Sequence, residues 1–132
     1  MVWGRKGIAM LELLVVDDDP NSRKIIELML SNQGYRLHFA EDGLAALEIF
    51  AREKIGLVLL DLLMPRLDGF ETAKRIKEMG EVPIVAISAL AFATDRQEAL
   101  EAGCDDFLTK PFARRSLIET IVRHSLKRQA LA

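Results

Sequence analysis

Cysteine is nearly absent from this chain of 132 residues, which contains one, Cys104. A single cysteine cannot form an internal disulfide, so a fold held together by internal disulfide bonds is excluded. This composition is typical of a protein from a reducing compartment, and we expect a cytoplasmic location. Cys104 lies in the stretch "EAGCDDF", where a small buried thiol is expected rather than a reactive one.

Long apolar runs and an excess of basic residues are also absent. No run approaches the roughly 20 apolar residues that a membrane-spanning helix needs. Residues 1–10 lack the apolar length and the cleavage site of a signal peptide. The chain carries 18 Lys and Arg against 20 Asp and Glu, a formal net charge of −2, which does not indicate a basic surface for nucleic acid. We therefore expect neither a membrane nor a nucleic acid as a direct partner.

The length suits one compact domain with its own hydrophobic core. Half of the residues are hydrophobic and 29% are charged, a balance typical of globular proteins. We interpret residues 1–10 as an N-terminal extension, residues 11–128 as the domain and residues 129–132 as a C-terminal tail. No output domain is expected to accompany it.

Apolar runs that predict strands alternate with amphipathic patterns that predict helices. The strands are expected at residues 11–16, 35–40, 56–60, 83–88 and 106–109, and the helices at residues 20–33, 43–54, 69–79, 94–102 and 114–127. The first, third and fourth strands are continuously apolar, as in central parallel strands covered on both faces. The pattern predicts an α/β, doubly wound, flavodoxin-like parallel sheet of five strands with five helices. The strand order 2-1-3-4-5 is the commoner of two options.

Polar side chains stand where the predicted strands end. The first strand runs into three consecutive acids, Asp17, Asp18 and Asp19, and the third ends at Asp61. Asp19 precedes Pro20 and is expected to cap a helix, which leaves Asp17 and Asp18 unexplained. Neighbouring strands lie about 4.8 Å apart, so Asp17, Asp18 and Asp61 are placed to share one Mg²⁺ ion, which prefers oxygen ligands.

Two further residues belong to the same edge of the predicted sheet. Ser88 ends the fourth strand and Lys110 follows the fifth. A carboxylate, a dication, a hydroxyl and an ammonium around one point suit phosphoryl transfer, because the cations neutralise charge on the phosphoryl oxygens while the carboxylate attacks. Taken singly, Asp61 is also explained as a solvated strand end, Ser88 as a core hydroxyl and Lys110 as a surface charge. Their joint placement favours a site.

Four stretches carry a family resemblance: "VVDDDP", "LLDLLMPRLDGFE", "PIVAISA" and "DDFLTKPF". In this order and at this spacing they resemble the receiver domain of two-component response regulators, in particular single-domain regulators of the chemotaxis type. The resemblance covers residues 11–127. It implies a phosphoacceptor switch rather than an enzyme, in which Asp61 accepts a phosphoryl group from a phosphohistidine of a histidine kinase or a histidine-phosphotransfer protein.

The resemblance also implies how the metal is held. Mg²⁺ would be bound by Asp17, Asp18 and Asp61 together with the backbone carbonyl of Leu63. A downstream protein target, which the sequence does not name, would recognise the phosphorylated form. The receiver would be a monomer or a phosphorylation-dependent dimer.

Further roles follow from the same resemblance. Ser88 and the backbone of Ala89 would bind a phosphoryl oxygen, and Lys110 would pair with it. Phe107 occupies the aromatic switch position, and the bond from Lys110 to Pro111 would be cis.

The first predicted helix holds more apolar residues than one core stripe requires. A wide buried face explains them; alternatively, Ile25 or Leu28 docks a histidine-phosphotransfer partner. His38 and His124 have no metal partner that the sequence reveals.

Two rival functions each lack a feature that they require. An aspartyl-phosphate phosphatase of the haloacid-dehalogenase type requires a second acid two residues after the nucleophile, where this chain has Leu63. A flavodoxin-like cofactor binder requires a Gly- or Ser/Thr-rich phosphate loop after the first strand, which is absent. In the receiver interpretation, Leu63 and Leu90 flank the path of the hydrolytic water, so slow self-dephosphorylation is expected. Alternatively, the two leucines pack on the surface and point away from the phosphoryl group.

Overall fold

Five parallel strands form one sheet in the computed structural model, which describes residues 10–64, 67–89 and 93–131. Their order is β2-β1-β3-β4-β5, so the predicted topology is confirmed. The strands are β1 (Glu12–Val16), β2 (Arg36–Ala40), β3 (Leu57–Asp61), β4 (Ile84–Ser88) and β5 (Asp106–Thr109). All residues of β3 and β4 are buried, which explains why these strands are apolar up to their last residues, Asp61 and Ser88.

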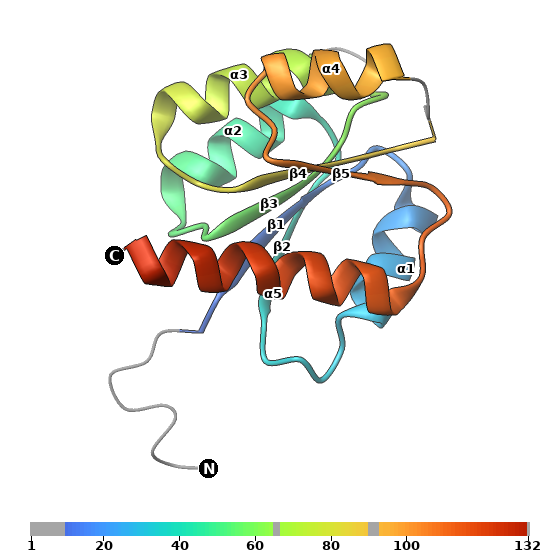
Figure 1. The fold of residues 1–132 in the computed structure, drawn as a ribbon, viewed down its shortest axis with the longest axis vertical. Helices are drawn as coiled ribbons and strands as arrows, with labels where there is room; N and C mark the ends of the chain where they lie inside the picture. Colours follow the sequence, from blue (N-terminus) through green and yellow to red (C-terminus); the bar gives the residue numbers. More distant parts are fainter. Residues whose placement is uncertain (1–9, 65–66, 90–92, 132) are drawn as a thin grey trace.

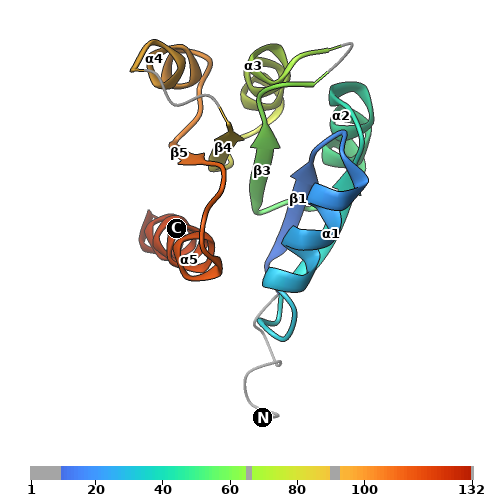
Figure 2. The same ribbon diagram turned by 90° about the vertical axis from the view of Figure 1, so that its right-hand side faces the viewer.

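Helices cover both faces of the sheet (Figures 1 and 2). They are α1 (Pro20–Met29), α2 (Gly43–Arg52), α3 (Gly69–Met79), α4 (Ala93–Glu101) and α5 (Arg114–Leu131). Alternate strand residues divide between two cores. Leu14 and Leu60 pack on the side of α2, α3 and α4, while Leu13 and Leu59 pack on the side of α1 and α5. The central strands therefore have no solvent-facing side.

Aspartates fix the start of three helices. The side chains of Asp19, Asp42 and Asp68 accept hydrogen bonds from backbone N–H groups in the first turns of α1, α2 and α3, respectively. Each carboxylate satisfies a donor that has no partner inside its helix. The expected cap at Asp19 is confirmed, and Asp68 likewise starts a helix.

Two helix ends differ from the sequence-based expectation by four residues, and the other ends by two at most. Helix α1 ends at Met29 rather than at residue 33. The hydroxyl of Ser31 donates to the carbonyl of Leu28 at 2.9 Å, and Asn32 has a φ of 64°. Such a local side-chain bond competes with helix continuation, and a left-handed residue ends it. At the other end of the chain, α5 extends to Leu131 rather than ending at residue 127.

No helix within the described ranges combines the length and the apolar character needed to cross a membrane.

Candidate functional site

The polar residues at the strand ends converge as the sequence predicts. Asp17 follows β1, Asp61 ends β3, Ser88 ends β4 and Lys110 follows β5. Carboxylate oxygens of Asp17, Asp18 and Asp61 all lie within 4.8 Å of one another. Three carboxylates at this separation repel one another, and a site made only of oxygen ligands fits a hard dication such as Mg²⁺.

The three consecutive aspartates have three different environments. The side chain of Asp17 is 2% exposed; its Oδ1 accepts from the N–H of Asp19 at 2.9 Å and its Oδ2 from Lys110 at 3.2 Å. Asp18 is exposed and makes no hydrogen bond within the described ranges. Asp19 accepts from the N–H of Asn21 at 2.9 Å and the hydroxyl of Ser22 at 3.3 Å. Asp19 therefore caps α1, Asp17 is held in place by hydrogen bonds, and the carboxylate of Asp18 is accessible to a ligand.

Lys110 links the two buried carboxylates. Its Nζ lies 3.2 Å from Oδ2 of Asp17 and 3.5 Å from Oδ2 of Asp61. The backbone N–H of Lys110 donates to the carbonyl of Ser88 at 2.8 Å, which fixes the start of this long side chain. The Lys110–Pro111 peptide bond is cis, as the resemblance implies.

Burial governs the ionisation of Asp61. It raises the pKa of this carboxyl from its ordinary value to about 6, while the N–H of Leu63 lowers it, Asp17 raises it further and Lys110 lowers it. Burial alone lowers the pKa of Lys110, but the charges of Asp61 and Asp17 outweigh burial and raise it. Burial thus destabilises the charged form of Asp61, and a bound dication would offset this destabilisation.

The destabilised charge of Asp61 predicts that, without metal, the free energy of unfolding depends on pH. The pKa of Asp61 is about 6 in the folded chain and about 3.9 in an unfolded one. Between these values the folded chain binds more protons, so the free energy of unfolding falls as the pH rises. We expect Asp61→Asn to be the more stable protein at pH 7 in EDTA, by on the order of 1 kcal/mol after solvent screening. Urea unfolding should show this difference shrinking toward pH 4; parallel profiles would contradict it.

The switch residues of the resemblance lie at the end of β4 and on β5. Ser88 is fully buried and Ala89 is exposed next to it. Phe107 is 8% exposed, and the guanidinium carbon of Arg96 in α4 lies 4.9 Å from the centre of its ring. This cation–π contact, which the sequence did not predict, ties the orientation of Phe107 to α4.

Gly69, the first residue of α3, lies against the backbone that carries Asp61. A Cβ atom at this position would collide with the Cα of Leu62 and would lie 2.6 Å from the carbonyl oxygen of Asp61. These are backbone atoms and cannot turn aside. We expect Gly69→Ala to lower the free energy of unfolding by about 3 kcal/mol and to distort the acidic site. Urea unfolding measures the loss.

Gly80→Ala is the matched control for this substitution. A Cβ at Gly80 would meet only the ring of Phe50, at 3.5 Å, an ordinary van der Waals distance, and the backbone there is extended. Equal losses of stability in the two variants would contradict the proposed close approach at Gly69.

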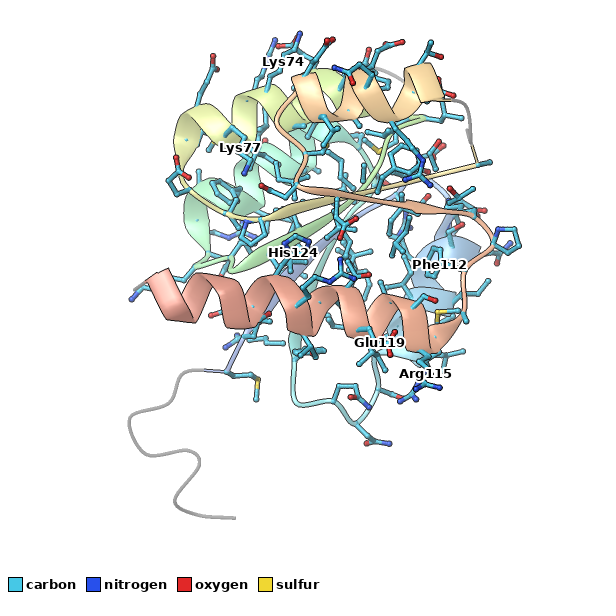
Figure 3. The ribbon with its side chains drawn as sticks, in the orientation of Figure 1. Lys74, Lys77, Phe112, Arg115, Glu119 and His124 are labelled. Carbon is cyan, nitrogen blue, oxygen red and sulfur yellow. The ribbon has the colours of Figure 1, made fainter. Side chains whose placement is uncertain are left out.

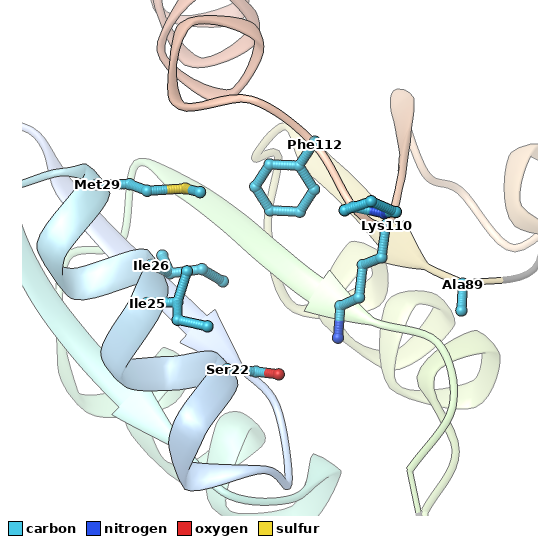
Figure 4. A pocket seen from close by; sticks show the side chains of 8 residues that line it. Ser22, Ile25, Ile26, Met29, Ala89, Lys110 and Phe112 are labelled. Carbon is cyan, nitrogen blue, oxygen red and sulfur yellow. The ribbon is translucent and has the colours of Figure 1, made fainter.

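A groove lies next to Lys110, between α1 and the segment joining β5 to α5 (Figure 4). Its volume is about 440 Å³. The guanidinium Nε of Arg114 donates to the carbonyl of Met29 at 2.7 Å and joins its two sides. The lining residues are Ser22, Ile25, Ile26, Met29, Ala89, Lys110, Pro111 and Phe112.

The two surplus apolar residues of α1 differ in their relation to this groove. Ile25 is 52% exposed and lines it, whereas Leu28 is 61% exposed and is not among the lining residues. Ile25 and Leu28 therefore do not belong to a wide buried face, which was the other explanation for the surplus apolar residues of α1.

Sequence reasoning missed three contacts that join helices to the sheet or to the strand ends. A guanidinium nitrogen of Arg23 donates to the backbone carbonyl of Asp17 at 2.7 Å. On β5, Oδ2 of Asp106 lies 2.7 Å from Arg123 and 2.9 Å from Nε2 of His124, which lies on the side of α5 that faces the sheet (Figure 3). All three contacts join residues whose relation depends on helix orientation, which the sequence does not reveal.

Comparison with known proteins decides the family. The family model described as the response regulator receiver domain matches residues 13–122. The chain belongs to this family. Its receiver fold is also seen in chemotaxis protein CheY4 of Vibrio cholerae, which is 28% identical with a TM-score of 0.84, the match covering 88% of this chain and 99% of that one. The resemblance stated from the motifs is therefore confirmed.

Curated relatives are regulators of greater length. The probable transcriptional regulator ycf27 of Porphyridium aerugineum is 43% identical over 117 residues, 89% of this chain and 48% of the relative. The chain thus spans about half the length of this relative. A receiver domain of a Pseudomonas aeruginosa sensor histidine kinase, solved with a magnesium ion coordinated in its active-site cleft, is 36% identical with a TM-score of 0.80, covering 89% of this chain and 98% of that one.

Proposed function

We propose that this receiver accepts a phosphoryl group on Asp61 from a phosphohistidine of a histidine kinase or a histidine-phosphotransfer protein. The observation that carries the proposal is the position of the Asp61 carboxylate. It is largely buried, lies within 4.8 Å of the carboxylate oxygens of Asp17 and Asp18, and has the ammonium of Lys110 at 3.5 Å. A buried nucleophile between a cation site and a fixed ammonium suits attack on phosphorus.

Asp17, Asp18 and Asp61 are the residues that would hold Mg²⁺, joined by the backbone carbonyl of Leu63. The ion would supply positive charge to the oxygens of the transferred group. An oxygen of Asp61 forms the new bond to phosphorus, the phosphorus–nitrogen bond of the donor breaks, and its electron pair returns to the imidazole. The ammonium of Lys110 then turns from Asp17 toward the phosphoryl oxygens.

The proposed output is a rearrangement near β4 and β5. The hydroxyl of Ser88 and the backbone N–H of Ala89 would bind a phosphoryl oxygen, and Phe107 would repack in response. Charge-assisted bonds of this kind bias a two-state element. The contact between Phe107 and Arg96 supports a path from the site to α4, where a downstream protein would recognise the change. The receiver would act as a monomer or as a phosphorylation-dependent dimer.

The groove beside α1 suits a partner that brings the phosphohistidine. Ile25 offers an exposed apolar side chain within it, next to Lys110. An amphipathic helix of the donor would bury this residue, with Leu28 at the margin. Relatives named as probable transcriptional regulators support a role for the phosphorylated receiver in the control of transcription.

Phosphorylation by a small donor tests the proposal. Acetyl phosphate with Mg²⁺ should add one phosphoryl group per chain, seen as a single mass increment, and EDTA should prevent it. An enzyme of the phosphatase type would instead release phosphate over many turnovers without accumulating the adduct. That result, or uptake independent of Mg²⁺, would overturn the proposal.

Slow loss of the phosphoryl group is a further expectation. Leu63 lies beside Asp61 with 51% of its surface exposed and offers no hydrogen bond to a water molecule; Leu90, the other flanking residue, lies outside the described residues. We expect Leu63→Asn to speed decay of the purified phosphoprotein about fivefold, the effect of a hydrogen bond worth about 1 kcal/mol.

The matched control for this decay measurement is Leu28→Asn. Leu28 is similarly exposed, at 61%, and belongs to α1. Equal decay of Leu63→Asn and the wild type, or equal acceleration in both variants, would show that Leu63 does not shield the phosphoryl group.

A further inference from the structure

A second cluster of potential metal ligands lies at the opposite end of β1 from Asp17. It consists of Glu12, His38 and Glu53, whose ligand atoms all lie within 4.8 Å of one another. Glu12 begins β1 and Asp17 follows its end, so five residues of strand, about 17 Å, separate the two clusters. The cluster therefore lies well away from the phosphoacceptor site.

Strand register and a helix end bring the three side chains together. His38 pairs with Leu14 across β1 and β2, and Glu12, two residues before Leu14, points to the same face of the sheet. That face is the one covered by α2, because Leu14 packs in the core with Ala46 of that helix. Glu53 is the cap residue at the end of α2. Three separate elements thus contribute one ligand each.

The side chains are partly withdrawn from solvent and oriented toward one another. Nε2 of His38 lies 2.8 Å from Oε1 of Glu12, and their side chains are 15% and 22% exposed. Glu53, 31% exposed, meets Arg52 through Oε2 at 3.0 Å. A carboxylate has a second oxygen with which it can bind a cation. The hydrogen bond from Arg52 lowers the pKa of Glu53, and the charges of His38 and Arg36 contribute, so Glu53 is ionised at neutral pH.

We propose that Glu12, His38 and Glu53 form a binding site for a transition-metal dication of the Zn²⁺ class. Imidazole nitrogen and carboxylate oxygen are both ligands that Zn²⁺ accepts, and one imidazole with two carboxylates would leave the fourth position of a tetrahedral site to water. The acidic site has only oxygen ligands and suits Mg²⁺. The chain thus offers two cation sites that differ in ligand chemistry.

The bound ion would cross-link the edge strand β2 to β1 and to the end of α2. Binding to the folded chain alone stabilises it by mass action, because the three ligands come together only on folding. The competing explanation is an imidazolium that bridges two glutamates without a metal. It makes the same contacts but needs no Zn²⁺, so the two are separable by titration.

Calorimetric titration of the full chain with ZnCl₂, in excess Mg²⁺ at pH 7.5, tests the site. We expect one Zn²⁺ per chain at this cluster, and His38→Gln should weaken its binding at least tenfold, since even residues behind the ligands commonly contribute that much. Zn²⁺ should raise the midpoint of thermal unfolding of the wild type and not that of His38→Gln. Glu12→Gln, expected to show the same loss, replaces His38→Gln should that variant fail to fold.

Two controls exclude other sites. The sequence has one other histidine, His124, and His124→Gln should retain the Zn²⁺ affinity. Asp18→Ala, which removes a ligand from the acidic site, should retain the Zn²⁺ affinity as well. Absence of Zn²⁺ binding, unchanged affinity in His38→Gln, or an equal loss in His124→Gln would each overturn the proposal.

Discussion

Asp61→Asn should take up no phosphoryl group from acetyl phosphate under conditions in which the wild type is modified on every chain. The amide is a poor nucleophile and leaves the cation site with one carboxylate fewer. Its shape is retained, so the hydrogen bond from the N–H of Leu63, 3.0 Å long in the wild type, has an oxygen acceptor. The loss should therefore come from chemistry and not from unfolding. Intact-protein mass measured against time follows it.

Glu78→Gln is the control for the loss of one negative charge. Glu78 is exposed on α3 and is not part of the acidic site, so this variant should be modified at the wild-type rate. Circular dichroism should show both variants folded, with Asp61→Asn the more stable of the two at pH 7 in EDTA. Labelling of Asp61→Asn at the wild-type rate would show that another residue is the phosphoacceptor.

The sheet was predictable because its pattern of apolar residues depends only on local sequence. Strands with two covered faces are expected to be apolar, and β3 (Leu57–Asp61) is apolar at every position before its terminal Asp61. The strand order was a choice between two options, which the structure decides. The early end of α1 at Met29 was not predictable from periodicity, because a side-chain bond from Ser31 ends the helix before its apolar pattern does.

The site was predictable to the extent that it follows strand ends. Asp17, Asp61 and Lys110 each stand where a parallel strand stops, and such ends meet at one edge of a sheet. The cluster at Glu12, His38 and Glu53 was not predictable, because it depends on the register of β1 against β2 and on where α2 ends. Nothing in the sequence sets His38 apart from a surface histidine.

The adjacent acids Asp17, Asp18 and Asp19 show how far neighbouring residues can differ in role. Asp17 is enclosed, with its oxygens engaged by Lys110 and by the N–H of Asp19. Removing its side chain would leave Lys110 without one of its two carboxylate partners. A weaker Mg²⁺ affinity of such a variant could then come from the lost ligand or from a disturbed structure. Asp18 and Asp19 allow the two effects to be separated.

Asp18→Ala should weaken Mg²⁺ binding at least tenfold, because it removes a proposed ligand and a full negative charge from the acidic site. Its free energy of unfolding without metal should stay within about 0.5 kcal/mol of the wild type, since Asp18 is exposed and holds no helix or strand in place. Mg²⁺ titrations of the two proteins, followed through the stabilisation that the ion confers, give the affinity ratio.

Asp19→Ala should behave in the opposite way. Its carboxylate accepts from the N–H of Asn21 at 2.9 Å, so its loss leaves the first turn of α1 without its cap and costs about 1 kcal/mol of stability. Mg²⁺ affinity should be nearly retained, because Asp17 is held through the backbone N–H of residue 19, which alanine also provides. Unchanged Mg²⁺ binding in Asp18→Ala would mean that Asp17 and Asp61 hold the ion without Asp18. Equal weakening in both variants would mean that the loss comes from a disturbed start of α1 and not from a missing ligand.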